Sequence, residues 1–363
     1  MTVRMRPVLA ELPAYVPGRN VPGSIKLASN ETSYGPLPHV VDRITAAAAD
    51  VNRYPDTNSS ELIAALAAKF GVGAERLVVG CGSVSLCQQL VQATAGQGDE
   101  VIFGWRSFEA YPIITAIAGA QAVQVPLRDQ VHDLPAMAQA ITDRTRLIFL
   151  CNPNNPTGTA VPGVQLTEFL DQAPSDVLVV LDEAYREFVT DEKVQDGTGL
   201  LERYPNIIVL RTFSKAYGLA GLRVGYGIAA DPAVATAVRQ TQVPFAVTHV
   251  AQAAALASLE PEATRQLADR VAEVVAERGR VTAGLRAAGY QLPDSEANFV
   301  WLADGPAEHG GIDAMAFAAG CEARGLIVRA FAGSGVRITI GTAAENDKLL
   351  AAAAELRAEQ PAG

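Results

Sequence analysis

The chain has 363 residues, 49% of them hydrophobic, so it is long enough to bury a large core and is expected to form about two domains. Its 29 basic and 39 acidic residues give a net charge of -10, which argues against a nucleic-acid or membrane surface. We find no signal-peptide pattern, no apolar run of membrane length and no CxxC spacing among the four cysteines. We therefore expect a reduced, cytoplasmic protein without a metal site.

From about residue 60 onward, short apolar runs alternate with amphipathic segments that are rich in alanine. The segment SSELIAALAAKFG has the periodicity of a helix, which Gly71 is expected to end. Seven runs have the composition of strands: LVVG (77–80), EVIFG (100–104), AVQVPL (122–127), RLIFLC (146–151), VLVVLD (177–182), NIIVLR (206–211) and RVGYGIA (223–229). Because continuous apolar strands between helices form parallel sheets covered on both faces, we predict a doubly wound α/β domain.

After Pro244 the pattern changes to that of a smaller α+β domain. A long helical segment precedes the strand-like stretches NFVWLA, GLIVRAF and GVRITIGT. The first 35 residues are rich in Pro, Gly and Asn and are expected to pack on the small domain as an arm. The predicted organisation is an arm over 1–35, a large domain over 36–245 and a small domain over 246–363.

Polar residues follow four of the predicted strands, in the stretches CGSVS, NPNNPTG, LDEAY and TFSK. Ligands of open α/β sheets bind at the carboxyl ends of strands, so we expect these residues to lie together. Asp182 ends a strand buried on both faces and needs a cationic partner, unless it caps the following helix. Lys215 lies at the end of the next predicted strand. A lone lysine is usually solvated, but this pairing is typical of a reactive amine near a buried acid.

The stretch GCGSVS places glycine and serine where a helix is expected to begin, and backbone N–H groups there bind anions. Gly82 and Ser83 are therefore candidates for a phosphate cup, although the stretch also suits an ordinary turn. Arg223 supplies a charge for a phosphate or forms a structural ion pair. An acid, a lysine, an arginine and an anion cup at one sheet edge match the requirements of pyridoxal phosphate.

The ordered motifs NRYPD, GCGS, NPNNPTG, DEAY, TFSKAYGLAGLRVGY and VRITIGT resemble the fold-type I pyridoxal-phosphate aminotransferases. The likeness covers nearly the whole chain, from 27 to 342, and is to the histidinol-phosphate aminotransferase group, including relatives that act on aromatic amino acids. This resemblance implies a mostly parallel seven-stranded sheet with a small α+β domain, and pyridoxal 5'-phosphate as cofactor. It also implies amino acid and 2-oxo acid substrates and a homodimer with shared active sites.

The resemblance implies three catalytic residues. Lys215 would bind the cofactor covalently and later move a proton, Asp182 would keep the pyridine nitrogen protonated, and Tyr185 would hydrogen-bond the ring oxygen together with Asn155. The other implied cofactor contacts are Gly82, Ser83, Phe108, Thr212, Ser214 and Arg223, with Tyr54 reaching the cofactor of the neighbouring subunit. Phe108 would stack on the ring, although it also suits ordinary core packing.

For the substrate, Arg337 matches the arginine that binds the α-carboxylate, with Asn155 beside it, and a guanidinium suits that planar anion. Tyr15 and Arg329 match positions that line the side-chain pocket. Arg329 keeps histidinol phosphate open as a substrate, because the resemblance implies that this arginine helps to hold the substrate phosphate.

Three features resemble the relatives that act on aromatic amino acids instead. The phosphate cup is GCGSVSLC, whereas histidinol-phosphate enzymes commonly have an acidic cup, and Ala330 stands where those enzymes often have proline. The third feature is the stretch GWRSFEAYP. We therefore predict an aromatic amino acid aminotransferase that transfers the amino group of Phe, Tyr or Trp to 2-oxoglutarate by a ping-pong mechanism. Histidinol-phosphate aminotransferase is the alternative. A decarboxylase or lyase with the same cofactor, or a non-catalytic cofactor-binding regulator, is less favoured.

Overall fold

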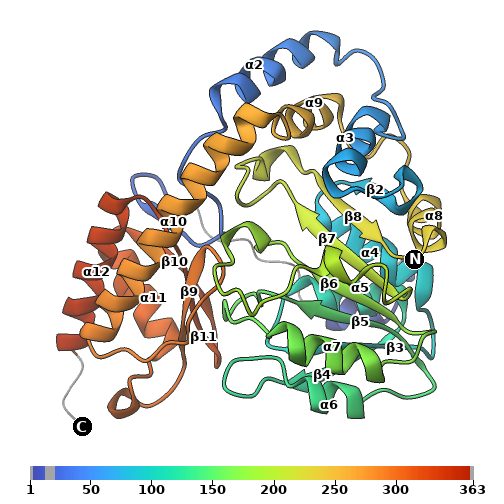
Figure 1. The fold of residues 1–363 in the computed structure, drawn as a ribbon. Coiled ribbons are helices and arrows are strands. Elements are labelled where there is room, and N and C mark those ends of the chain that lie inside the picture. The colour runs from blue at the N-terminus through green and yellow to red at the C-terminus, as the bar shows by residue number, and fades with distance from the viewer. Residues whose placement is uncertain (1–2, 13–20, 360–363) are drawn as a thin grey trace.

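The computed structural model describes residues 3–12 and 21–359, which contain two β-sheets flanked by helices (Figure 1). The large sheet has seven strands in the order β2-β8-β7-β6-β5-β3-β4. Its strands are β2 (Leu77–Gly80), β3 (Glu100–Trp105), β4 (Gln121–Pro126), β5 (Thr145–Cys151), β6 (Leu178–Asp182), β7 (Ile207–Thr212) and β8 (Gly225–Ala229). Only β8 runs antiparallel to its neighbours, so the predicted mostly parallel seven-stranded sheet is confirmed.

Helices cover both faces of the large sheet, which explains the continuous apolar strands. Along β5, Ile148 packs with one buried cluster and its neighbour Phe149 packs with the other. The helices α4 (Ser83–Thr94), α5 (Ala110–Ala118) and α8 (Pro232–Thr241) cover one face. The helices α6 (Leu134–Gln139) and α7 (Gly163–Gln172) cover the other face (Figure 1).

The small sheet has four strands in the order β1-β10-β11-β9. These are β1 (Ile25–Leu27), β9 (Phe299–Ala303), β10 (Leu326–Phe331) and β11 (Gly335–Thr339). The helices α10 (Pro261–Ala287), α11 (Ala314–Ala323) and α12 (Ala343–Ala358) lie beside it, at the left of Figure 1. β1 comes from the predicted arm and pairs parallel with β10, so the small sheet contains strands from the N-terminal and the C-terminal parts of the chain.

The remaining helices are α1 (Val8–Glu11), α2 (Pro38–Ala47), α3 (Ser60–Phe70) and α9 (His249–Ala257). Helix α3 ends where the sequence predicts, because Gly71 adopts the left-handed conformation (φ 65°) that suits a helix C-terminus. Helix α12 begins with a capping box between Thr342 and Glu345. Among the described residues, no helix has both the length and the apolar character needed to cross a membrane. The domain boundaries at 35/36 and 245/246 stay predictions.

Candidate active site

A cavity of about 500 Å³ lies at the carboxyl ends of β5, β6 and β7 and is also lined by β10 and β11 of the small sheet. The strand register places the ends of the three large-sheet strands side by side, because Cys151 pairs with Asp182 and Asp182 pairs with Leu210. The sequence-predicted residues that line the cavity are Ser83, Phe108, Asn155, Asp182, Tyr185, Thr212, Ser214, Lys215, Arg223, Arg329 and Arg337.

Lys215 lies just beyond β7, and its Nζ donates a hydrogen bond to the carbonyl oxygen of Ser29 at 3.4 Å. Burial, with a further contribution from the positive charge of Arg337, lowers the pKa of this lysine to about 7. An amine with this pKa is largely neutral just above pH 7, whereas an ordinary lysine with a pKa of about 10.4 is not. Lys215 is therefore suited to act as a nucleophile or a base.

Asp182 is buried at the end of β6, where its two carboxylate oxygens have different surroundings. Oδ2 accepts a hydrogen bond of 2.7 Å from the hydroxyl of Tyr111, whose ring stacks on Phe149. Oδ1 has no hydrogen-bond partner among the described residues and belongs to a residue that lines the cavity. Burial raises the pKa of Asp182, while the Tyr111 hydrogen bond and the charge of Lys215 oppose this. The free oxygen suits a protonated nitrogen.

Tyr111 contacts Asp182, a predicted catalytic residue, and was missed by sequence reasoning. It lies in α5, in the stretch EAYP, where an aromatic residue is usually read as part of the apolar core. Its ring is indeed fully buried, and only its hydroxyl reaches the carboxylate of Asp182. The sequence signal for this contact is weak. It consists of a tyrosine at a helix position expected to be buried, because a buried tyrosine hydroxyl needs a hydrogen-bond partner.

An anion cup forms where α4 begins. Gly82, the residue before the helix, has φ 75°, and a Cβ there would collide with the guanidinium of Arg223. Arg223 Nη1 lies 3.3 Å from the hydroxyl oxygen of Ser214, and Thr212 and Ser83 also line the cavity. A helix N-terminus, a guanidinium and hydroxyl groups together suit a phosphate.

Arg337 projects from β11 and is buried. Its Nη1 donates to Asn155 Oδ1, and its Nη2 donates to the carbonyl oxygen of Ala28 at 2.8 Å. The contact with Arg337 uses Asn155 Oδ1, so the expected hydrogen bond from the Asn155 NH2 group to the ring oxygen stays a prediction. A guanidinium held in this way can bind a carboxylate with two parallel hydrogen bonds.

Arg329, which lines the cavity, forms a cluster of three charged residues with Arg106 and Glu109. Arg329 Nη2 forms an ion pair with Glu109 Oε2 at 3.0 Å. Both arginines have their guanidinium 5.3 Å from the centre of the Phe331 ring. Burial lowers the pKa of Arg106, the charge of Glu109 raises it, and the charge of Arg329 lowers it further. Sequence reasoning missed Glu109, because no local pattern reveals a partner 220 residues away.

One described residue among those predicted, Tyr54, lies away from this cavity. Tyr54 is 82% exposed and stacks on Phe245 with a ring separation of 4.5 Å. Tyr15 lies outside the described residues. Phe108 lines the cavity and packs edge-on against the ring of Tyr111, and its stacking on the cofactor ring stays a prediction.

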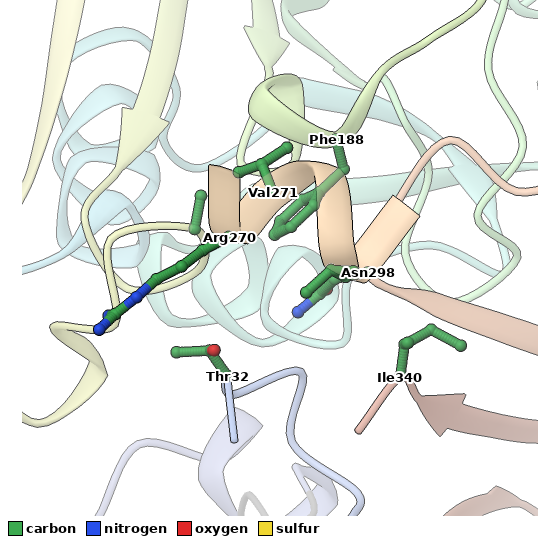
Figure 2. Close-up of a pocket in the computed structure, with 8 residues that line it drawn as sticks. Thr32, Phe188, Arg270, Val271, Asn298 and Ile340 are labelled. Carbon is green, nitrogen blue, oxygen red and sulfur yellow. The ribbon is translucent and has the colours of Figure 1, made fainter. Parts of the chain in front are cut away.

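A much smaller cavity lies between α10 and the segment that carries Thr32, with Phe188, Asn298 and Ile340 around it (Figure 2). Its volume of about 10 Å³ is close to that of one water molecule. It is therefore too small for an amino acid. Among the described residues, no group of three or more His, Cys, Asp or Glu side chains is arranged to hold a metal ion.

The residues of the large cavity fit pyridoxal phosphate: a free carboxylate oxygen for the pyridine nitrogen, an amine for the aldehyde carbon and a cup for the phosphate. Fold and site together define an aminotransferase of fold type I. Residues 22–352 match the model of the class I and II aminotransferases, and the chain belongs to this family.

The chain is 58% identical to the aromatic amino acid aminotransferase of Rhodococcus jostii, covering 99% of this chain and 97% of that protein. It is 56% identical to the aromatic amino acid aminotransferase of Streptomyces coelicolor, covering 98% of each chain. Among solved structures, it is similar to histidinol-phosphate aminotransferase from Sinorhizobium meliloti in complex with pyridoxal-5'-phosphate. The TM-score is 0.88 with 29% identity, over 99% of this chain and 98% of that one.

Proposed function

We propose that the protein is an aromatic amino acid aminotransferase that uses pyridoxal 5'-phosphate and passes the amino group of Phe, Tyr or Trp to 2-oxoglutarate. The observation that carries this proposal is the full-length identity of 58% and 56% to two enzymes with that name. The histidinol-phosphate aminotransferase of similar structure is only 29% identical.

The ion pair between Arg329 and Glu109 supports an uncharged substrate side chain. Arg329 lines the side-chain end of the cavity, and the Glu109 carboxylate compensates its charge. A substrate phosphate carrying up to two negative charges would have to compete with Glu109 for this guanidinium. The apolar side chains of Phe108 and Ile113, which also line the cavity, suit an aromatic ring instead.

When bound, pyridoxal phosphate withdraws electrons from the substrate Cα and so makes the Cα proton acidic. Lys215 Nζ would hold the cofactor through its neutral form and would afterwards accept the Cα proton. Asp182 Oδ1 would accept a hydrogen bond from the pyridine nitrogen and keep it protonated. Tyr185 would donate to the ring oxygen, with Asn155 nearby, and Arg337 would bind the substrate α-carboxylate.

The remaining cofactor contacts follow from the same cavity. The phosphate would lie at the start of α4, and Phe108 would pack against the cofactor ring. The residues proposed to hold the phosphate are Gly82, Ser83, Thr212, Ser214 and Arg223. Tyr15 stays a prediction for the substrate pocket.

We further propose a homodimer in which Tyr54 reaches the phosphate of the partner's cofactor. The exposed apolar residues of the described chain include Val51, Tyr54, Val243 and Phe245. Exposed apolar side chains of this size are typical of a protein interface, and Tyr54 stacks on Phe245.

The cytoplasmic location also belongs to this proposal and is supported by four cysteines without a disulfide. The division into an arm, a large and a small domain is supported by the two separate sheets.

Single-turnover absorbance spectra of the purified enzyme with its cofactor test the substrate. Rapid loss of the yellow absorbance with phenylalanine, and not with histidinol phosphate, is the expected result. The reverse would make the protein a histidinol-phosphate aminotransferase. Release of carbon dioxide or ammonia, without glutamate when 2-oxoglutarate is added, would indicate a decarboxylase or a lyase instead.

A further inference from the structure

Three consecutive residues that follow β1 contact three different side chains of the active site. The carbonyl oxygen of Ala28 accepts a hydrogen bond from Arg337, and that of Ser29 accepts one from Lys215. The side-chain Nδ2 of Asn30 donates to the Tyr185 hydroxyl oxygen at 2.9 Å. Of these three contacts, only the last is made by a side chain, so only at Asn30 does residue identity control the contact directly.

Thr339 determines which way the Asn30 amide points. The backbone N–H of Asn30 donates to Thr339 Oγ1 at 2.9 Å, and this hydroxyl in turn donates to Asn30 Oδ1 at 3.2 Å. The amide oxygen is thus engaged, and the NH2 group faces Tyr185. The backbone carbonyl of Asn30 is held separately by Asn298 Nδ2, at 3.2 Å.

The backbone of Asn30 supports a role for its side chain. The residue is 1% exposed and has φ 53°, the left-handed conformation that glycine adopts most easily. Asparagine is among the few other residues that tolerate it. A position that favours glycine but carries a buried, fully hydrogen-bonded asparagine points to a function of the amide group.

A tyrosine hydroxyl that accepts a hydrogen bond from Asn30 must direct its own hydrogen elsewhere. Tyr185 lines the large cavity, and its ring is held edge-on by Phe299, so the hydroxyl hydrogen is available to the cavity. We propose that Asn30 is a positioning residue that turns the Tyr185 hydroxyl hydrogen towards the ring oxygen of the cofactor. This rests on the proposed role of Tyr185. Its consequence is that the anionic form of the cofactor's ring oxygen is stabilised.

The test is the pH midpoint of the absorbance change of the bound cofactor, measured without any amino acid substrate. Asn30→Gly removes the donor and keeps the backbone conformation, whereas Asn30→Asp replaces the donor with an acceptor that would attract the Tyr185 hydrogen. We expect the proton affinity of the chromophore to rise roughly three- to tenfold in Asn30→Gly and further in Asn30→Asp. The matched control Asn298→Ala removes the hydrogen bond to the Asn30 carbonyl but leaves the Asn30 amide in contact with Tyr185, so the midpoint should stay unchanged.

A double-mutant cycle with Tyr185→Phe separates positioning from general loosening of the site. In the Tyr185→Phe background, Asn30→Asp should cause no further shift of the midpoint. An unchanged midpoint in folded, cofactor-loaded Asn30→Gly, or an equal shift with and without the Tyr185 hydroxyl, would overturn the proposal. An unchanged midpoint in Tyr185→Phe alone would instead refute the role of Tyr185 and the proposal with it. Either result leaves the substrate assignment untouched.

Discussion

The two sheets contribute to the active site in different ways. The large sheet places Asp182 and Lys215 at the ends of the adjacent strands β6 and β7, so their proximity follows from strand order alone. The small sheet contributes Arg329 and Arg337, which are positioned by contacts with residues far away in the chain. Arg337, for example, contacts a carbonyl group 309 residues away. The groups proposed to perform the chemistry thus lie in local motifs, whereas the groups proposed to bind the substrate depend on long-range contacts.

If the large sheet carries the chemistry, the largest loss should come from Lys215→Ala. We expect formation of glutamate from phenylalanine and 2-oxoglutarate to fall by about 10⁴-fold or more, because attachment of the cofactor and proton transfer are both lost. Lys69→Ala is the matched control, since Lys69 lies exposed on α3, outside the cavity. Substantial residual activity in Lys215→Ala, with no added amine, would contradict the assignment.

The second prediction concerns Asp182, the other large-sheet residue. Asp182→Asn should lower the turnover rate by roughly 10²–10³-fold, because a neutral amide no longer stabilises the protonated pyridine nitrogen. Tyr111→Phe should cost only about tenfold, since it removes one hydrogen bond to Oδ2 and leaves the charge in place. Turnover rates at saturating phenylalanine provide the measurement. Equal losses in both variants would show that Asp182 acts mainly through Tyr111.

The sequence could predict the large sheet and its catalytic pair because both depend on short patterns. One strand begins two residues later than predicted, at Gly225 instead of position 223, because Arg223 adopts a left-handed conformation (φ 60°) that interrupts the extended region. β1 was not predicted, since its three residues are too few to show a pattern. Arg329 and Arg337 were found only through the family resemblance.

Asn30, Glu109 and Tyr111 escaped prediction for a common physical reason. Each contacts its partner through the polar end of one side chain, and that partner lies 71 to 220 residues away in the chain. Such a contact produces no periodic pattern in the sequence, because the types of the neighbouring residues are determined by their own helix or turn and not by the distant partner. Only the three-dimensional arrangement reveals these partners.

The pKa of Lys215 gives a third prediction. Burial lowers this pKa to about 7, so the neutral amine is lost as the pH falls below 7. The rate at which the cofactor-free enzyme attaches pyridoxal phosphate should rise about tenfold from pH 6 to pH 8 and then level off. Stopped-flow absorbance would measure it. A rate that keeps rising up to pH 10 would show that Lys215 has an ordinary pKa. The contribution of the large sheet to catalysis would then not depend on a lowered lysine pKa.

The smallest expected effect lies on the small-sheet side, at the pair of Glu109 and Arg329. Glu109→Gln releases the guanidinium from its carboxylate partner and leaves the size of the side chain nearly unchanged. The pair is partly exposed, with 29% and 17% of the two side chains accessible, so its electrostatic contribution is modest. We expect the ratio of kcat/KM for phenylalanine to that for histidinol phosphate to fall about fivefold, which corresponds to about 1 kcal/mol.

The control for this prediction is Glu61→Gln, an exposed glutamate on α3, which should leave the ratio as it is. High salt should shrink the effect of Glu109→Gln, because screening weakens a partly exposed pair. If the turnover rate fell equally for both donors, Glu109 would be acting on the chemistry. The division between a large sheet that carries catalysis and a small sheet that selects the substrate would then fail at this residue, even though the ion pair itself was present.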